Sequence, residues 1–349
     1  MISVVVPVRN SEKTIGDLLE ALKRQTRKDF EVILVDDGST DRTVKVAEES
    51  GKGLNLRIVR QKPRGPAAAR NLGAEKARGE IIVFTDSDCV PDERWLEEMV
   101  KPFEDESIVG VQGTYRTLNR DSLIARLEGY EIERRHRRME RKKFTDFVAT
   151  FSAAYRKEVF KKFGGFDESY PAASGEDPDL SYRIAKAGGK MVFNPRAFVY
   201  HRHPGTLGEF ARQKFYRGYW RSLLHRKYPE KMAGDAYTPA DVQLSVATVS
   251  LLYASLILAP LLAPVFLLLF LVSNLGAIRF YASRERKMLL AAPPLLFLRT
   301  SLWIFGFAAG TVKEVLLRPR TGTSSKRGRP NRGGRRARRT EASKGGRRR

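Results

Sequence analysis

Short apolar runs alternate with amphipathic helical patterns along the first third of the chain. The runs are rich in Val, Ile and Leu and have the length of buried strands. They cover residues 2–8, 31–35, 56–60 and 80–86. Between them apolar residues recur three and four positions apart, as from Ile15 to Leu22, which predicts helices. Because strands that alternate with helices form βαβ units, the pattern predicts an α/β fold with a mainly parallel sheet.

Polar residues follow three of the predicted strands, in the sequences PVRN, DDGSTD and DSD. Ligands of parallel sheets bind beyond the carboxyl ends of the strands, where these residues would gather. Asp86 and Asp88 of the last sequence could together hold Mg²⁺ or Mn²⁺, which prefer oxygen ligands. Acidic turns are also common on protein surfaces, so this pair alone leaves both interpretations open.

The sequence GEDPDL at 175–180 also has two interpretations. Asp177 could cap a helix in which Pro178 takes the first position and Asp179 lies near the positive end. Alternatively, Asp177 could be a catalytic base, held rigidly because it stands at a helix N-terminus. The local pattern does not choose between them.

The C-terminal part contains two long apolar blocks. Residues 242–278 include no charged side chain and exceed the ~20 residues that cross a bilayer. This block predicts one long tilted span or two short spans that turn at Pro260–Pro264. The second block, 288–312, contains Arg299 and is expected to break at Pro293–Pro294, so a transmembrane, interfacial or re-entrant helix would fit it.

The formal net charge of +24 is concentrated near the C-terminus. Residues 317–349 predict a disordered polybasic tail, which we expect to lie on anionic lipid headgroups at the cytoplasmic face. RNA binding by this tail is the less favoured alternative. Residues 133–143, ERRHRRMERKK, predict a solvated basic helix face. The single cysteine, Cys89, excludes an internal disulfide and a cysteine-based zinc site.

The motifs occur in a characteristic order: VPVRN, VDDGSTD, AARNLGAEKARGEIIVFTDSD, FKKFGGFDE, GEDPDLSYRIAKAGGK and NPRAFVYH. In this order and at these spacings they resemble the family 2 glycosyltransferases, inverting enzymes with the GT-A nucleotide-sugar fold. The resemblance covers residues 2 to about 220. It departs from the Q-x-x-R-W motif of processive members, because Gln213, Arg217 and Trp220 are spaced differently here. We therefore infer no processivity.

The resemblance implies a donor site, a metal site and a catalytic pair. The nucleotide-sugar donor would be bound by Pro7, Val8, Asn10, Asp36, Asp37, Arg70, Asn71 and Asp86. Mn²⁺ or Mg²⁺ would be held by Asp88 and His201, with His203 as the fallback ligand. The base would come from the pair Glu176 and Asp177, with Asp177 favoured. Asp179 and Arg183, four residues apart on a helix, would form a supporting ion pair.

These features predict a membrane-anchored, metal-dependent inverting glycosyltransferase. Its acceptor would be a hydroxyl of a lipid-linked or cell-surface glycan. A polyprenyl-phosphate glycosyl synthase and a nucleic-acid-binding membrane protein are the alternatives. We expect a GT-A catalytic domain, a linker or interfacial segment, a membrane region with two crossings, and the basic tail, with the domain and tail in the cytoplasm. Their bounds would be 1–225, 226–241, 242–316 and 317–349.

Overall fold

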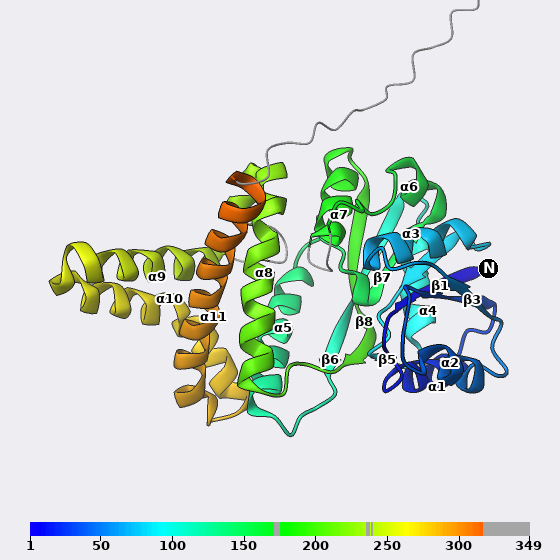
Figure 1. Cartoon of the computed structure of the whole chain (residues 1–349), viewed down its shortest axis with the longest axis horizontal. Coiled ribbons are helices and arrows are strands. Elements are labelled where there is room, and N and C mark those ends of the chain that lie inside the picture. Colours follow the sequence, from blue (N-terminus) through cyan, green and yellow to red (C-terminus); the bar gives the residue numbers. More distant parts are fainter. Residues whose placement is uncertain (171–174, 235–237, 239, 317–349) are drawn as a thin grey trace, which may run out of the picture.

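The computed structural model describes residues 1–170, 175–234, 238 and 240–316. The predicted polybasic tail, 317–349, lies outside the described residues. Figure 1 shows two parts: an α/β domain built around one sheet, and a group of long helices along one side of it.

One eight-stranded sheet forms the centre of the α/β domain, in the order β3-β2-β1-β4-β7-β6-β8-β5. Strands β3, β2, β1 and β4 are parallel, β7 is antiparallel to both of its neighbours, and β8 runs parallel to β6. The predicted α/β fold with a parallel-dominated sheet is confirmed. The strands are β1 (Ile2–Val8), β2 (Phe30–Asp36), β3 (Leu56–Arg60), β4 (Ile81–Phe84), β5 (Cys89–Pro91), β6 (Ile108–Thr117), β7 (Ala153–Arg156) and β8 (Lys190–His201).

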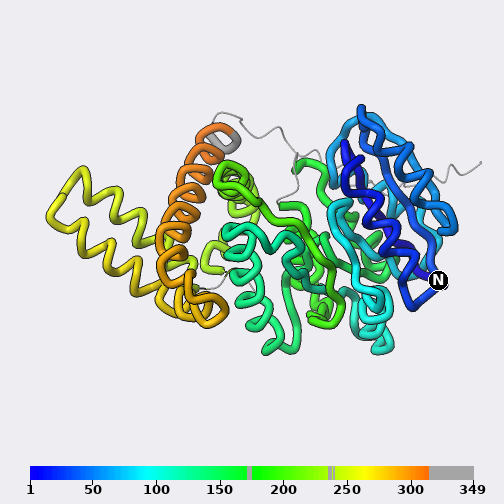
Figure 2. Tube along the Cα trace, turned by 90° about the horizontal axis from the view of Figure 1, so that it is seen from below, coloured from blue at the N-terminus to red at the C-terminus, as the bar shows by residue number. Residues whose placement is uncertain are grey.

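Helices cover both faces of this sheet, because successive side chains of a strand point to opposite sides. In β1, Val4 and Val6 join a buried cluster with Leu18 of α1, whereas Val5 joins another with Ala69 of α3. Figure 1 shows α3 on one side of the sheet and α1 with α2 on the other, and Figure 2, seen from below, looks onto the α1 side. The helices of this domain are α1 (Ile15–Lys23), α2 (Thr43–Ser50), α3 (Pro66–Lys76), α4 (Trp95–Val100), α6 (Lys157–Lys162) and α7 (Glu176–Lys186).

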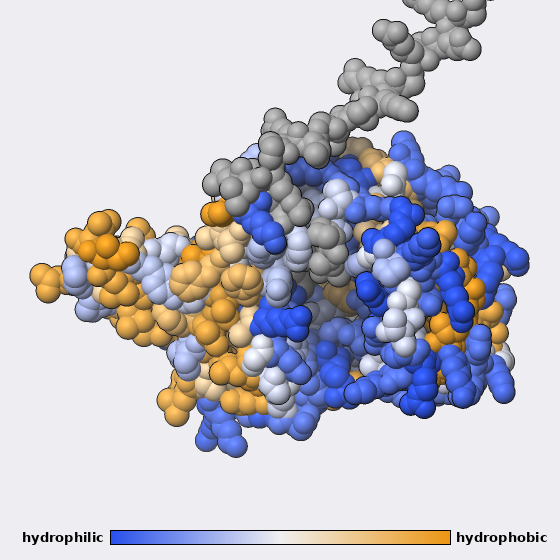
Figure 3. Space-filling model, viewed as in Figure 1, coloured by the Kyte–Doolittle hydropathy of each residue, from blue (hydrophilic) through white to orange (hydrophobic). Residues whose placement is uncertain are grey.

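Long helices make up the second part of the molecule. They are α5 (Leu123–Met139), α8 (Leu207–Lys227), α9 (Ala240–Leu258), α10 (Ala263–Arg284) and α11 (Met288–Gly310). Three of them, around α9, α10 and α11, are long and apolar enough to cross a membrane. Helices α9 and α10 form a hairpin that projects away from the rest of the molecule, and its surface is mostly apolar (Figures 1 and 3).

The first apolar block therefore forms two helices with a turn between them. Of the two predicted alternatives, this is the one with two short spans. Pro260 begins the short turn Pro260–Leu262 between them, since proline lacks the N–H that a continuing helix requires. The break that we expected in the second block is absent. Pro293 and Pro294 lie inside the continuous helix α11, near its start.

Helix α11 packs along α8 instead of projecting with the hairpin (Figure 1). Its Arg299 is buried and forms an ion pair of 3.1 Å with Glu131 of α5. Glu131 and the neighbouring His136 are buried too. The expectation of a solvated face over 133–143 is thus wrong for His136, because its ring packs against Tyr115 of β6 and Phe193 of β8.

Candidate active site

A cavity of about 980 Å³ lies between the sheet, α7 and α8. Polar side chains from several elements line it. Six of the residues that the sequence predicted are among them: Arg70, Asp86, Asp88, Glu176, Asp177 and His201. Asp86 and Asp88 follow β4, and His201 ends β8, so the strand ends meet at this cavity as the topology of the sheet predicts.

Asp177 lies in the first turn of α7 and does not cap it. The helix begins at Glu176, and its N-cap residue is Gly175, which makes no side-chain cap. The capping interpretation of Asp177 is therefore wrong by two residues, and Asp177 lines the cavity. Burial, and then the charge of the neighbouring Glu176, raises the pKa of Asp177 to about 8.

Arg70 joins two carboxylates of the cavity. Its Nη1 donates to Glu176 Oε1 at 2.8 Å, and its Nη2 donates to Asp86 Oδ1 at 2.8 Å. The guanidinium is 3% exposed, so both charge-assisted bonds lie in a poorly hydrated environment. Arg70 thereby holds Glu176, the residue before Asp177, close to Asp86 of the DSD sequence.

Asp88 and His201 lie together at the cavity. Cys89 pairs with His201 across β5 and β8, and this register sets the preceding Asp88 beside the imidazole. Asp88 Oδ2 and His201 Nε2 are 3.5 Å apart. The Sγ atom of Cys89 is also close enough to share a metal with them. However, burial raises the pKa of this thiol well above its ordinary value, so it stays protonated and is a poor ligand for Mn²⁺ or Mg²⁺.

The fallback ligand, His203, also lines the cavity but is 5% exposed. Burial lowers the pKa of His203 to about 3, which keeps the ring neutral. The centroids of its ring and the His201 ring are 5.2 Å apart. Among the described residues it belongs to no cluster with Asp88 that could hold a metal, so the geometry favours His201.

The predicted ion pair between Asp179 and Arg183 is confirmed, with Arg183 Nε 2.9 Å from Asp179 Oδ2. Neither residue lines the cavity. Arg183 also donates from Nη2 to the carbonyl of Gly165 at 2.7 Å, and Asp179 accepts from the Tyr228 hydroxyl at 3.0 Å. The pair connects α7 to the loop at 163–165 and to the end of α8. It therefore helps to hold in place the helix that carries Asp177.

The predicted donor residues at the ends of β1 and β2 lie outside the cavity. Pro7 and Val8 close β1, and Asp36 closes β2. Asn10 has a left-handed backbone (φ 51°) and its Oδ1 accepts from the Thr40 N–H at 2.9 Å. This contact joins the segments that follow the two strand ends.

Asp37 follows the end of β2, and protein donors already bind both of its carboxylate oxygens. Its Oδ1 accepts from the Arg64 N–H at 2.8 Å and from Gln61 Nε2 at 2.7 Å, and its Oδ2 accepts from the Gly65 N–H at 2.9 Å. Asp37 thus shapes the loop over 61–65, which leads into α3 and towards Arg70.

Asn71 is turned away from the cavity as well. Its Nδ2 donates to the carbonyl of Phe166 at 2.8 Å, and its Oδ1 accepts from the N–H of the same residue at 2.9 Å. This pairing fixes the loop at 164–168. The prediction of a donor contact for Asn71 has no counterpart in the described geometry of the cavity.

Gln213, Arg217 and Trp220 entered the sequence analysis only as a departure from a motif, and the wall that α8 contributes was not predicted from it. This wall includes Arg212, Gln213, Tyr216, Arg217, Trp220 and Arg221. Their spacing of three and four residues places them on one helix face, a signal that the sequence contains. It was obscured because the helix is basic on every side and shows no apolar stripe.

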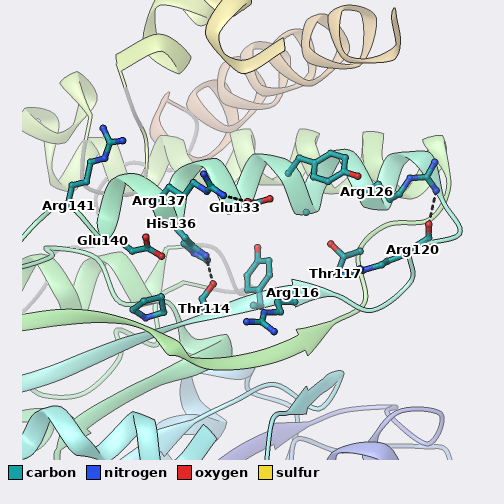
Figure 4. A pocket seen from close by; sticks show the side chains of 14 residues that line it. Thr114, Arg116, Thr117, Arg120, Arg126, Glu133, His136, Arg137, Glu140 and Arg141 are labelled. Carbon is teal, nitrogen blue, oxygen red and sulfur yellow. Dashed lines mark hydrogen bonds and ion pairs between the residues drawn. The ribbon is translucent and has the colours of Figure 1, made fainter. Parts of the chain in front are cut away.

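A second cavity, of about 860 Å³, lies between β6 and α5 (Figure 4). None of the predicted site residues lines it. Several of its cations are neutralised within the protein: Arg126 lies 2.8 Å from Glu285, and Arg137 lies 3.0 Å from Glu133. The first cavity is therefore the candidate active site.

The chain is similar to known glycosyltransferases. The family model for glycosyl transferase family 2 matches residues 3–164. The pre-mycofactocin glycosyltransferase of Mycobacterium tuberculosis is 29% identical over 238 residues, which are 66% of this chain and 49% of that protein. The uncharacterized glycosyltransferase EpsJ of Bacillus subtilis is 28% identical over 242 residues, 67% of this chain and 69% of that protein. The matched region is thus about half the length of the first relative.

Two solved structures share the fold. The mannosyltransferase PcManGT from Pyrobaculum calidifontis, in complex with GDP-Man and Mn²⁺, has a TM-score of 0.62 and 22% identity, over 90% of this chain and 87% of that one. TarS of S. aureus has a TM-score of 0.51 and 19% identity, over 91% and 92%. With the family match and the sheet order, they identify the domain as an α/β GT-A domain followed by apolar helices. The match over residues 3–164, the relatives and the shared fold make this chain similar to the glycosyltransferases of family 2.

Proposed function

We propose that the protein is a metal-dependent, inverting glycosyltransferase that transfers a sugar from a UDP- or GDP-linked donor to a hydroxyl group of a lipid-linked or cell-surface glycan. The observation that carries the proposal is that Asp177 and the Asp88–His201 pair line one cavity. A base for the acceptor and ligands for a metal beside the donor phosphates are what this reaction needs. The GDP-Man and Mn²⁺ held by the related mannosyltransferase fold support the choice of donor and metal.

Asp177 would act as the base. The acceptor oxygen bonds to the anomeric carbon while the bond from that carbon to the diphosphate oxygen breaks. The hydroxyl proton moves to an oxygen of Asp177, and the nucleoside diphosphate leaves with the bonding pair. A single displacement of this kind inverts the configuration at the anomeric carbon. The raised pKa of Asp177 makes its carboxylate a stronger base than an exposed aspartate.

Asp88 and His201 fit a divalent cation, since they offer one oxygen and one nitrogen ligand in a cavity that is rich in carboxylates. Burial raises the pKa of Asp88, and nearby Asp86 adds to the shift. A bound cation would neutralise the charge that develops on the departing diphosphate. Arg70 holds Asp86 and Glu176 in position independently of that cation.

We further propose that the α9–α10 hairpin crosses the membrane and that α11 lies at its surface. The tip of the hairpin is apolar and exposed, with Ile257 at 83% and Leu261 at 94% exposure. By contrast, α11 buries Arg299 against the catalytic domain. Two crossings would leave the domain and the basic tail on one side, the cytoplasm, where the tail could meet anionic lipid.

The test is the variant Asp177→Asn, with Asp17→Asn on the exposed side of α1 as its control. UDP- and GDP-sugars are first screened for Mn²⁺-dependent thermal stabilisation to find the donor. We expect Asp177→Asn to keep this stabilisation and to lose transfer by about 10²-fold or more. Full transfer activity in Asp177→Asn would remove Asp177 from the role of base.

A further inference from the structure

The α8 wall of the active-site cavity is basic apart from Glu209, whereas the DSD sequence and the start of α7 form an acidic wall that Arg70 bridges. The acidic wall holds Asp86, Asp88, Glu176 and Asp177. The basic wall, together with the end of β8, holds Arg202, Arg212, Arg217 and Arg221. The acids account for the metal and the proton transfer of the proposed function. The arginines have no part in that mechanism and require their own explanation.

The packing of α8 fixes the direction of these arginines. Glu209, Arg212, Tyr216 and Trp220 recur along one face of the helix and line the cavity. On another face the backbone of α8 touches α11 directly, and a side chain at Gly306 would meet the carbonyl oxygen of Phe215. Because such close backbone packing prevents α8 from turning, the arginine face stays directed into the cavity.

Two arginines of this wall, Arg212 and Arg221, differ in their pairing from the buried lysine of α8. Lys214 is fully buried and lies 2.6 Å from Glu128. Arg212 and Arg221 form no ion pair with any carboxylate among the residues that the structure describes. Neighbouring cations repel one another unless an anion binds between them. The planar guanidinium group matches the geometry of phosphate oxygens, so a phosphate would suit this position.

The same wall lies close to the apolar surface of the molecule. Helix α8 lines the cavity and packs against α11, which exposes Leu289, Leu290 and Phe305. The hairpin of α9 and α10 continues this apolar surface (Figure 3). A ligand that reaches the basic wall from this side would carry an anionic group next to an apolar chain.

We propose that the basic wall of α8 binds the phosphate of a lipid-linked acceptor, so that the acceptor of this enzyme is an anionic glycolipid joined to its lipid through a phosphate or diphosphate. This inference rests on the proposed function, because it names the acceptor of the same site. Arg212 and Arg221 hold the phosphate, and Trp220 and Tyr216 line the path of the attached sugar towards Asp177.

Binding of farnesyl diphosphate to the full chain in detergent, measured by calorimetry, tests this proposal. Farnesol supplies the same chain without charge, and inorganic pyrophosphate supplies the charge without the chain. We expect farnesyl diphosphate to bind at least about tenfold more tightly than either of them. In R212Q/R221Q its affinity should fall by about tenfold or more. K45Q/K52Q removes two exposed charges remote from the cavity and should leave the affinity unchanged.

The donor site is the main competitor for a diphosphate, and Asp88→Ala separates the two sites. We expect Asp88→Ala to lose Mn²⁺-dependent binding of UDP or GDP and to retain binding of farnesyl diphosphate. R212Q/R221Q should retain binding of the nucleotide and lose affinity for farnesyl diphosphate. Retained nucleotide binding also shows that R212Q/R221Q is folded. The proposal is overturned if Asp88→Ala loses farnesyl diphosphate, if R212Q/R221Q keeps it, or if pyrophosphate binds equally well. Absence of nucleotide binding in the wild type would instead contradict the proposed function.

Discussion

Arg70 and Glu176 form an ion pair of 2.8 Å between α3 and the first residue of α7, and both side chains are buried. The same guanidinium reaches Asp86 at 2.8 Å. One cation therefore holds together the acid that precedes Asp177 and an acid that follows β4. The position of Asp177 depends on a helix that lies about a hundred residues earlier in the chain.

Removal of this cation should destabilise the catalytic domain. Arg70→Met would leave Glu176 buried without its partner, a change that typically costs about 3–5 kcal/mol. Thermal unfolding of the purified chain in detergent measures the effect as a lower Tm. Arg27→Gln, which breaks an exposed pair with Asp29, is the control and should leave Tm nearly unchanged. Equal Tm values for the two variants would contradict the structural role of Arg70.

Transfer should depend on the ionisation of Asp177. A base must lose its proton before it can accept another, and the pKa of Asp177 is raised to about 8. We therefore expect kcat/KM for the nucleotide sugar to rise as pH increases from 6 to about 8 and then to level off. Glu176→Gln removes the like charge beside Asp177 and should move this rise to lower pH. If Glu176→Gln leaves the dependence of kcat/KM on pH unchanged, the two carboxyl groups are not coupled as proposed.

The same shift predicts a pH-dependent stability difference. Since the folded state raises the pKa of Asp177, it binds that proton more tightly than the unfolded state does. The stabilisation is complete below the ordinary pKa of 3.8 and is lost as pH rises towards about 8. The Tm of Asp177→Asn minus that of the wild type should therefore increase from pH 4 to pH 8. A constant difference across this range would show that Asp177 is not buried as described.

Much of the fold could be predicted from local patterns. The strands at 2–8 and 56–60 match β1 and β3 in full, because short apolar runs between helical repeats have few other solutions. The acids of the DSD sequence also lie at a strand end, as the predicted topology requires, and Asp88 lies beside His201, as the family resemblance implied. The Asp179–Arg183 pair followed from helical spacing alone. These features depend on nearby residues or on general rules of sheet topology.

The features that could not be predicted depend on tertiary partners. Arg299 in an apolar block indicates an unusual membrane helix until Glu131 of α5 is seen to pair with it. The spacing of the arginines places them on one face of α8, but the direction of that face depends on contact with Gly306 of α11. Asn71 shares its sequence neighbourhood with Arg70 but points to the loop at Phe166, a choice that only the folded loop determines.

Metal binding should depend on His201 and not on His203. Asp88→Ala and His201→Ala each remove a ligand, so Mn²⁺-dependent stabilisation by the nucleotide should be lost or strongly weakened. A Mn²⁺ titration followed by thermal shift measures this. Cys89→Ala should leave the titration unchanged, because the buried thiol stays protonated. If His203→Ala loses Mn²⁺ while His201→Ala keeps it, the ligand assignment is wrong.

Contact between α8 and α11 should be sensitive to a single methyl group. A Cβ at Gly306 would meet the carbonyl oxygen of Phe215, which is backbone and cannot move aside without a shift of the helix. We expect Gly306→Ala to lower Tm in detergent and to reduce transfer more than nucleotide binding, since α8 contributes the acceptor wall. Gly208→Ala, at a position of α8 with open space around it, is the control and should maintain or slightly raise Tm. Identical behaviour of the two variants would show that α11 does not hold α8 in place, and the fixed direction of the arginine face would then need another cause.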